Sequence, residues 1–396
     1  MTRPTKRLSD LCDFVGVQVD PASRADETYV GLEHVASARF VRIGAGKASD
    51  VQSSKYAFRP GDVLYGKLRP YLDKAALAGD TGICTTELLV LRPKAGVDPR
   101  FLVGVVHAPT FVEHAVAGTT GVQHPRTSWN HIADFEMPAF GADEQTKIAD
   151  ILWEVHDAIT AIETAIKAGA DLKRAATRVL FTRGLRGEAQ KETDVGLVPE
   201  SWNLTPAEQI FKLTSGKTRP DSLIPGPTAE KPFPVMGGNG TMGYSSDWNF
   251  EADQTLVIGR VGEYCGAIHL ATGKIWITDN ALYAKYWLKP EANIGFIAAF
   301  LEYFDLNRFK RMAGQPLVTQ GMINEHSFPL PDPDEQREIV EILDAIDLTI
   351  DLHKRKRAVL EDLFKVLLHK MITAEIRVAD LDLSALAKAP FDGVAA

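Results

Sequence analysis

The chain has 396 residues, of which 45% are hydrophobic and 24% charged, and its net charge is −8 at pH 7. This length exceeds the size at which a single hydrophobic core usually stops growing, so two or more domains are expected. No apolar run approaches the roughly eighteen residues that a membrane-spanning helix needs, and the basic N-terminus lacks the apolar stretch of a secretory signal. We therefore expect a soluble, cytoplasmic protein without membrane segments.

The three cysteines, Cys12, Cys84 and Cys265, are isolated in the sequence. They offer neither a disulfide framework nor the CxxC spacing of a zinc site. The acidity is concentrated in residues 139–204 and 332–396, whereas residues 1–138 and 205–331 are nearly neutral. A reducing compartment and a metal-free protein are expected, and either near-neutral region could still present a basic face to a polyanion.

In chain order, the pattern predicts a β-containing domain over residues 1–138 and a long helical segment over 139–187. A second β-containing domain over 188–331 and a second helical segment over 332–378 follow, and then a tail over 379–396. Each domain includes a predicted helix (Phe101 to Ala115, and Phe296 to Met312), then a polar loop, and then a short strand that ends in proline (FEMP and FPLP).

The order of elements reflects an internal repeat. Residues 138–162 match residues 331–353, and from Asp143 against Asp334 the offset is a constant 191, which continues into LFTRGLRG against MITAEIRV. In the domains, DVLYGKL matches TLVIGRV and TTELLVL matches TDNALYA, both at an offset of 193, which places Lys67 on Arg260. The domains differ more than the helices do, which suggests one scaffold that presents two different recognition surfaces.

The helical segments carry apolar residues at steps of three and four. This heptad spacing produces a narrow seam suited to helix-on-helix packing. Asp143 or Asp334 can cap the helix starts, and helices of about 36 residues would each span about 54 Å. We expect the two seams to pack on each other, the alternative being two unrelated amphipathic helices that each lie on their own domain. The seam residues, which could also dock a partner, are Ile148, Leu152, Val155, Ile159, Ile162, Ile339, Leu343, Ile346, Ile350, Leu360 and Phe364.

Catalytic and nucleotide-binding motifs are absent from the sequence. SGKT at 215–218 lacks the first glycine of a P-loop, because that position is Phe211. Gly238, Gly240 and Gly243 satisfy GxGxxG, but the turn-like residues after them open no helix for a pyrophosphate. There is no HExxH, GxSxG or Asn-Pro-Pro-aromatic motif, so we predict no catalytic residue, no metal and no cofactor on this chain.

What remains is a set of polar, planar and basic side chains on predicted loops, which is the chemistry that reads nucleic acid. Any one of them could instead be an ordinary solvated surface residue, but their recurrence on repeated loops favours DNA binding. In the first domain the candidates are Lys67, Arg69, Tyr71, Lys74, Thr119, Thr120, Gln123, His124 and Arg126. In the second domain they are Lys217, Arg219, Asn239, Tyr244, Arg260, Asn280, Gln315, Thr319 and Gln320.

Three phrases together resemble the specificity subunit of type I restriction-modification systems. They are FRPGDVLYGKLRPYLDKAAL…GICTTELLVLRP, the PxxxEQxxI helix entries and LVPESWN at the start of the second half, and the resemblance spans about residues 8–378. It implies an α+β fold in which two α/β target recognition domains are separated by two long conserved helices. Those helices would pack as an antiparallel coiled coil in a pseudo-two-fold internal repeat.

The resemblance also implies a function without catalysis. Each recognition domain would read one half of a bipartite site in double-stranded DNA, and the helices would set the gap between the halves. The partners would be two modification subunits, which bind S-adenosylmethionine and methylate adenine, and restriction subunits, which use ATP and Mg. Two alternatives stay open at this point: a duplicated coiled-coil scaffold that binds only proteins, and a methyltransferase or nuclease fragment, against which the missing motifs argue.

Overall fold

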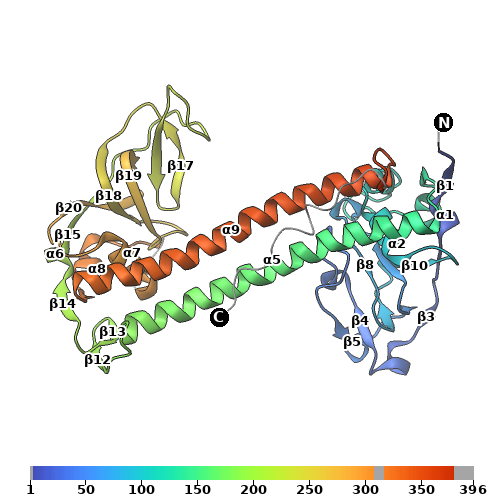
Figure 1. Cartoon of the computed structure of the whole chain (residues 1–396), viewed down its shortest axis with the longest axis horizontal. Coiled ribbons are helices and arrows are strands. Elements are labelled where there is room, and N and C mark those ends of the chain that lie inside the picture. The colour runs from blue at the N-terminus through green and yellow to red at the C-terminus, as the bar shows by residue number, and fades with distance from the viewer. Residues whose placement is uncertain (1–2, 307–315, 379–396) are drawn as a thin grey trace. The chain divides into compact units, whose positions relative to one another are not determined.

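The computed structural model describes residues 3–306 and 316–378. The chain divides into two compact units, of which unit 1 comprises Met1–Thr164 with His353–Ala396 and unit 2 comprises Ala165–Leu352. Each unit therefore contains a globular part, one portion of helix α5 and one portion of helix α9 (Figure 1). Each is described separately below.

Unit 1 has its strands in three sheets. The central sheet has the order β2 (Cys12–Phe14), β10 (Leu88–Pro93), β7 (Val63–Gly66) and β8 (Ala75–Leu77). A second sheet has the order β3 (Gln18–Val19), β6 (Lys55–Phe58), β9 (Gly82–Cys84), β4 (Thr28–Val30) and β5 (Gly46–Lys47), and β1 (Thr5–Arg7) pairs with β11 (Glu136–Pro138). The strands are short, so packing rather than long ladders holds the sheets together.

Unit 1 also contains four short α-helices among its described residues. They are α1 (Leu8–Leu11), α2 (Pro99–His107), α3 (Pro109–Ala117) and α4 (Trp129–Ile132). The single helix expected from Phe101 to Ala115 is wrong, because Ala108 adopts an extended conformation (ψ 136°) and Pro109 starts a new helix. A proline disfavours helical geometry in the residue before it, which accounts for the break.

Unit 2 is built around a six-stranded sheet. Its order is β15 (Phe211–Ser215), β20 (Ala281–Trp287), β18 (Phe250–Gly259), β19 (Ile268–Ile277), β16 (Phe233–Gly237) and β17 (Gly240–Ser245). Two two-stranded antiparallel sheets accompany it: the hairpin of β12 (Gln190–Thr193) with β13 (Gly196–Pro199), and β14 (Asn203–Pro206) paired with β21 (Ser327–Leu330), which is distant in the sequence. These strands carry the loops that hold most of the predicted DNA-binding residues of this half.

The short helices of unit 2 are α6 (Ala207–Ile210), α7 (Ile294–Phe304) and α8 (Gln320–Asn324). Helix α7 packs Phe296, Phe300 and Phe304 into a core that includes Phe181 of α5 and Ile339 of α9. The helix expected from Phe296 to Met312 ends earlier than predicted, at Phe304, where Asp305 adopts a left-handed conformation (φ 54°). Met312 lies outside the described residues.

Helices α5 (Ala142–Arg183) and α9 (Pro333–Ile372) are 42 and 40 residues long, which exceeds the expected 36. Within unit 2 they run antiparallel. Lys173 of α5 pairs with Asp347 of α9 (2.7 Å), and just beyond the C-terminal end of α5 the backbone N–H of Leu185 donates to the carboxylate of Glu335 (3.0 Å), which lies earlier on α9. Within unit 1, the N-terminal part of α5 shares one core with Phe364, Leu368 and Met371 of α9. The prediction that the seams pack on each other is confirmed.

The start of α9 corrects a predicted cap. The carboxylate of Asp332, not that of Asp334, accepts hydrogen bonds from the backbone N–H groups of Asp334 and Glu335 (3.0 Å each). Asp334 and, in α5, Asp143 lie inside the first turn of their helices, where an acidic side chain still interacts favourably with the helix dipole.

The internal repeat is confirmed by equivalent hydrogen bonds in the two units. In unit 1 the side chain of Gln145 accepts from the N–H of Asp98 (3.2 Å) and donates to the carbonyl of Phe140 (3.1 Å). In unit 2 Gln336 makes the same two bonds, with Asn293 (2.7 Å) and Pro331 (2.9 Å). The glutamine of each PxxxEQxxI motif is buried and fastens its long helix to the short helix of the adjacent globular part. The α+β class with two recognition-type domains and two long paired helices is as predicted.

Candidate nucleic-acid interface

In unit 1 three loops that are distant in the sequence lie against one another. The backbone N–H of Lys67, after β7, donates to the carbonyl of Glu87 (3.0 Å), and the N–H of Thr127 donates to the carbonyl of Lys67 (3.0 Å). The N–H of Arg69 donates to the carbonyl of Pro125 (2.7 Å). The predicted residues Lys67, Arg69 and Arg126 are thereby brought together.

Two of the predicted cations in this cluster are already engaged. The guanidinium of Arg126 makes a forked ion pair with Glu87, through Nε (3.0 Å) and Nη2 (3.1 Å). The hydrogen bonds and charge of Glu87 raise the pKa of Arg126 above its ordinary value. Lys74 donates from Nζ to the backbone carbonyl of Leu32 (2.7 Å). Both side chains tie loops together, so a direct contact with DNA is less suited to them than to Lys67.

The remaining predicted residues of unit 1 lie on the same loops. Thr119 uses its hydroxyl to donate to the carbonyl of Val116 (2.8 Å), which closes the end of α3. The exposed members of the set are Tyr71, Thr120, Gln123 and His124. A surface of exposed polar and aromatic side chains therefore surrounds the more enclosed Lys67.

Unit 2 repeats this arrangement with different side chains. The N–H of Arg260, after β18, donates to the carbonyl of Asn280 (2.9 Å), and the N–H of Val318 donates to the carbonyl of Arg260 (2.9 Å). These bonds are the counterparts of those that Lys67 makes with Glu87 and Thr127. The N–H of Asp279 donates to the carbonyl of Lys217 (2.9 Å), which adds a second predicted cation to the cluster.

The glycine-rich hairpin between β16 and β17 also reaches this cluster. A Cβ at Gly238 would lie 3.3 Å from the carbonyl oxygen of Asn280, which is a tight contact, so the lack of a side chain at this position favours the close approach of the hairpin. Asn239, at the exposed turn, is thereby carried to the same place as Asn280. No helix opens after these glycines, as the turn-like sequence predicted, because they lead into strand β17.

Of the other predicted residues of unit 2, two lie beside Arg260 and two lie elsewhere on the sheet and its loops. Thr319 accepts from the N–H of Met322 (3.4 Å) as the cap of α8, and with Gln320 and Arg260 it lines a recess of about 220 Å³. Arg219 is exposed in the loop after β15, and Tyr244 lies half-buried in β17, where it pairs with Pro234. Gln315 falls outside the described residues.

The comparison of the units also identifies a residue that the sequence reasoning missed. Tyr264 occupies the position in unit 2 that Tyr71 occupies in unit 1, and both side chains are exposed. The offset of 193 that relates Lys67 to Arg260 also relates these two tyrosines, so the signal was present in the sequence.

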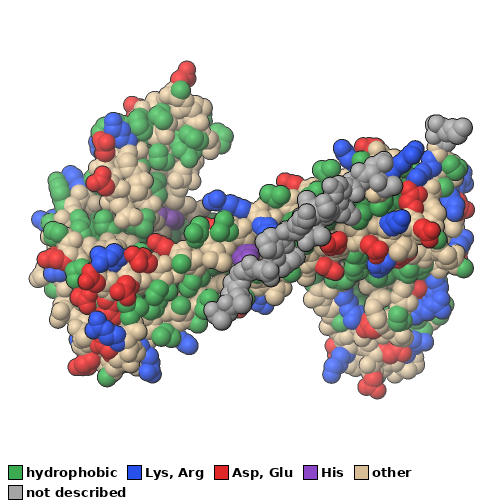
Figure 2. Space-filling model, viewed as in Figure 1, with side chains coloured by type: hydrophobic (Ala, Val, Ile, Leu, Met, Phe, Trp, Pro, Cys, Tyr) green, Lys and Arg blue, Asp and Glu red, His purple; other side chains and the backbone are tan. Residues whose placement is uncertain are grey.

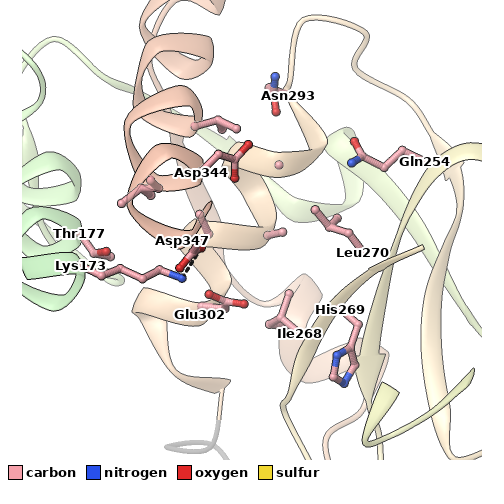
Figure 3. Close-up of a pocket in the computed structure, with 15 residues that line it drawn as sticks. Lys173, Thr177, Gln254, Ile268, His269, Leu270, Asn293, Glu302, Asp344 and Asp347 are labelled. Carbon is pink, nitrogen blue, oxygen red and sulfur yellow. Dashed lines mark hydrogen bonds and ion pairs between the residues drawn. The ribbon is translucent and has the colours of Figure 1, made fainter. Parts of the chain in front are cut away.

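Acidic and metal-ligating side chains were compared with the predicted interface. Among residues 3–306 and 316–378 no group of three or more His, Cys, Asp or Glu side chains is placed to hold a metal ion. A cavity of about 370 Å³ in unit 2 is lined by Glu302, Asp344 and Asp347, with Lys173 paired to Asp347 (Figure 3). Its acidic lining is unsuited to a phosphate backbone, and it contains none of the predicted DNA-binding residues.

The surface charge agrees with the near-neutral composition of the two globular parts. On the face drawn in Figure 2, basic and acidic side chains are interspersed over each unit, with no extended field of one sign. In the part of the chain that the structure describes, no helix is long and apolar enough to cross a membrane.

The helix seam is occupied within the chain. Its predicted members are buried except for Ile346 and Leu360, which are half-buried, so they offer little surface to a partner. Other apolar side chains of α5 and α9 are exposed and were not singled out from the sequence: Leu172, Val179, Ile342, Leu348, Leu352, Val359 and Val366. Docking of a partner on the helices stays a prediction, and these exposed side chains are its better candidates.

Comparisons with known proteins agree on one family. Residues 199–362 match the sequence-family model described as type I restriction modification DNA specificity domain. The putative type I restriction enzyme MjaX specificity subunit of Methanocaldococcus jannaschii is 22% identical over 370 residues, which cover 88% of this chain and 86% of that protein. The MjaVIII specificity subunit of the same organism is 22% identical over 404 residues, covering 95% and 93%.

Solved structures share the fold. The type I restriction-modification S subunit from M. genitalium aligns with a TM-score of 0.64 at 16% identity, covering 94% of this chain and 96% of that chain. A chain from a structure that describes complex assembly and conformational transition of the type I R-M system aligns with a TM-score of 0.56 at 18% identity, covering 95% and 100%.

Proposed function

Because the chain belongs to the specificity subunits of type I restriction-modification systems, we propose that each of its two globular parts reads one half of a bipartite DNA site. The chain is a non-catalytic, DNA-recognising component of such a system. The coiled-coil scaffold without DNA recognition is set aside, since the relatives along nearly the whole chain are specificity subunits.

The observation that carries the proposal is the repeated loop cluster. Lys67 and Arg260 hold the same place in the two units and make the same backbone hydrogen bonds, yet the side chains around them differ, as with Glu87 in one and Asn280 in the other. Base edges are distinguished by the donors and acceptors set opposite them. Equivalent frames with different side chains are therefore suited to reading two unlike half-sites.

The partner subunits would supply the chemistry and part of the affinity. We propose that two modification subunits, with S-adenosylmethionine, methylate adenine in the site, and that restriction subunits use ATP and Mg to cut DNA. Phosphate contacts by Lys and Arg dominate the affinity of most DNA-binding proteins. The mixed surface charge of this chain supports a need for phosphate contacts from those partners (Figure 2).

The long helices would set the unread gap between the half-sites and carry the modification subunits. At about 1.5 Å per residue, the 42 residues of α5 span about 63 Å, compared with the roughly 34 Å of one DNA turn. The exposed apolar side chains of α9, such as Leu352 and Val359, support docking of another helix there.

The test is methylome sequencing of a host that carries the chain together with its modification subunit. We expect one new N6-methyladenine motif with two specified halves and an unspecified gap. The absence of any new motif when all subunits are expressed and assembled would contradict the proposal.

A further inference from the structure

Two loops of similar backbone conformation, one in each unit, present a tyrosine to solvent. They are the loop from Gly66 to Lys74 and the loop from Gly259 to Ala267, and they are related by the offset of 193. Each begins after the strand that leads into the DNA-binding cluster, β7 in unit 1 and β18 in unit 2. The likeness extends to individual hydrogen bonds and backbone angles.

Three hydrogen bonds of the loop in unit 1 have counterparts in the loop of unit 2. Each loop closes on itself, contains a tight turn and is fastened to a proline of a second loop. In unit 1 these bonds are Gly66 N–H to Lys74 carbonyl (2.7 Å), Leu72 to Arg69 (2.8 Å) and Arg69 to Pro125 (2.7 Å). In unit 2 they are Gly259 N–H to Ala267 carbonyl (2.8 Å), Cys265 to Gly262 (3.1 Å) and Gly262 to Pro316 (3.1 Å).

The backbone angles correspond as well. Arg69 (φ 50°) and Asp73 (φ 48°) are left-handed in unit 1, and Gly262 (φ 83°) and Gly266 (φ 85°) are left-handed at the same places in unit 2. Residues other than glycine rarely adopt this conformation, and where it persists it clusters at functional sites. The loop of unit 1 keeps its shape although its sequence disfavours that shape.

Between the two left-handed residues of each loop lies a tyrosine, Tyr71 with 54% of its surface exposed and Tyr264 with 47%. Each follows the matched cation of its cluster, Lys67 or Arg260, in the same loop. A tyrosine loses little conformational entropy when its position is fixed, because it has only two side-chain torsions. An exposed aromatic side chain on a doubly anchored loop is thus suited to a defined contact.

The residues around the tyrosines differ between the loops: Pro70 and Leu72 in unit 1 correspond to Glu263 and Cys265 in unit 2. Positions that read different bases are expected to differ between the units, whereas a shared side chain must meet something that both half-sites share. The sugar-phosphate backbone is that common feature, and tyrosine hydroxyls are among the groups that contact it and fix the register of a protein on DNA.

We propose that Tyr71 and Tyr264 each donate a hydrogen bond from the phenolic hydroxyl to a DNA phosphate, one in each half-site, and so set the register of the two recognition domains. The inference rests on the proposed function, because it requires the two units to bind DNA. It assigns these tyrosines to positioning and leaves sequence reading to the side chains that differ.

The test uses the chain assembled with its modification subunits and DNA that carries the motif found by methylome sequencing. Tyr71→Phe and Tyr264→Phe should each weaken specific binding by roughly tenfold, the range expected for a lost hydrogen bond to a charged group. The dependence of affinity on salt should not change, since a neutral hydroxyl releases no counterion. The methylated motif should also stay the same in sequence.

A phosphate scan locates each contact. DNA with one neutral methylphosphonate at a time should identify a position in each half-site where the substitution weakens the wild-type complex. At one such position, the methylphosphonate should no longer weaken binding by the Tyr71→Phe complex, because the contact with that phosphate is already lost. For the Tyr264→Phe complex, the methylphosphonate that has no effect should lie in the other half-site. Tyr286→Phe is the control, because Tyr286 is 55% exposed but pairs with Lys212 at the end of β20 remote from the loop.

Three outcomes would overturn the inference while leaving the proposed function intact. The first is that both phenylalanine variants bind DNA as tightly as the wild type. The second is that alanine variants of the two tyrosines bind DNA more weakly while the phenylalanine variants do not, which would mean that the aromatic ring and not the hydroxyl contacts the DNA. The third is a changed motif, which would mean that the tyrosines read bases. Failure of the wild-type assembly to bind a bipartite motif would instead contradict the proposed function itself.

Discussion

Substitution of Gly169 in the middle of α5 tests the close approach of the two long helices. A Cβ at this position would lie 2.8 Å from Cγ1 of Ile350 on α9, and Ile350 is only 8% exposed. On an isolated helix Gly169→Ala should stabilise by about 1 kcal/mol. Overpacking a filled contact costs about 1–3 kcal/mol. The expected net effect is therefore a destabilisation of up to about 2 kcal/mol.

The sign should reverse when Ile350 is shortened. In an Ile350→Ala background the obstructing Cγ1 is gone, so Gly169→Ala should stabilise by about 1 kcal/mol, the helix propensity alone. The difference between the two backgrounds measures the coupling of the two positions. Ala170→Gly is the control: Ala170 is exposed, and this substitution should cost about 1 kcal/mol in both backgrounds.

Hydrogen exchange of peptides from residues 165–183 is the suitable assay, because it reports local opening free energies and does not require the whole chain to unfold in one step. If Gly169→Ala stabilises this segment equally in both backgrounds, the helices do not touch at Gly169 and the antiparallel register is refuted.

Three further predictions concern charge, pH and the spacer. Lys67→Gln and Arg260→Gln should each weaken DNA binding by the assembled complex. In filter-binding titrations each should reduce the slope of log affinity against log salt concentration by about 0.9, the value for one lost phosphate contact, and an unchanged slope would mean that these side chains do not contact phosphates. Burial lowers the pKa of His156 below 6.5, and the charges of Arg39 and His107 add to this although Asp157 opposes it. The unfolded state therefore binds more protons, so the stability of the fold should fall as the pH drops through 6.5. In thermal melts at pH 7.5 and 5.5, His156→Gln should lose this pH dependence, and a variant that loses as much stability as the wild type would exclude His156 as the cause. One heptad inserted into both α5 and α9, at positions that keep the two helices in register, lengthens each helix by about 10 Å, which corresponds to roughly three base pairs of DNA. Methylome sequencing should then show a longer gap between unaltered half-sites. An unchanged gap in an active complex would contradict the role of the helices as a spacer.

Several features were readable from the sequence because they depend on neighbouring residues. Heptad periodicity is local, so it identified both long helices and the seam that packs inside each unit. The repeat was visible because the buried glutamines Gln145 and Gln336 and the cations Lys67 and Arg260 keep their spacing. The break before Pro109 was also local and could have been predicted.

Other features required the tertiary structure, because they join residues far apart in the chain. The forked pairing of Arg126 with Glu87 removes one predicted DNA contact from the freely available cations, and no local pattern indicates it. The same holds for the sheet orders and for the apolar side chains of α9 that stay exposed, such as Val359.

The sequence by itself therefore determined the helices, the repeat and the family, since periodicity and spacing are carried by residues close together. Only the tertiary structure decided which loops meet, which cations are already paired and that the matched residues Tyr71 and Tyr264 are both exposed, on loops of similar conformation. Burial and pairing are properties of the folded chain, because they depend on which distant segments come into contact.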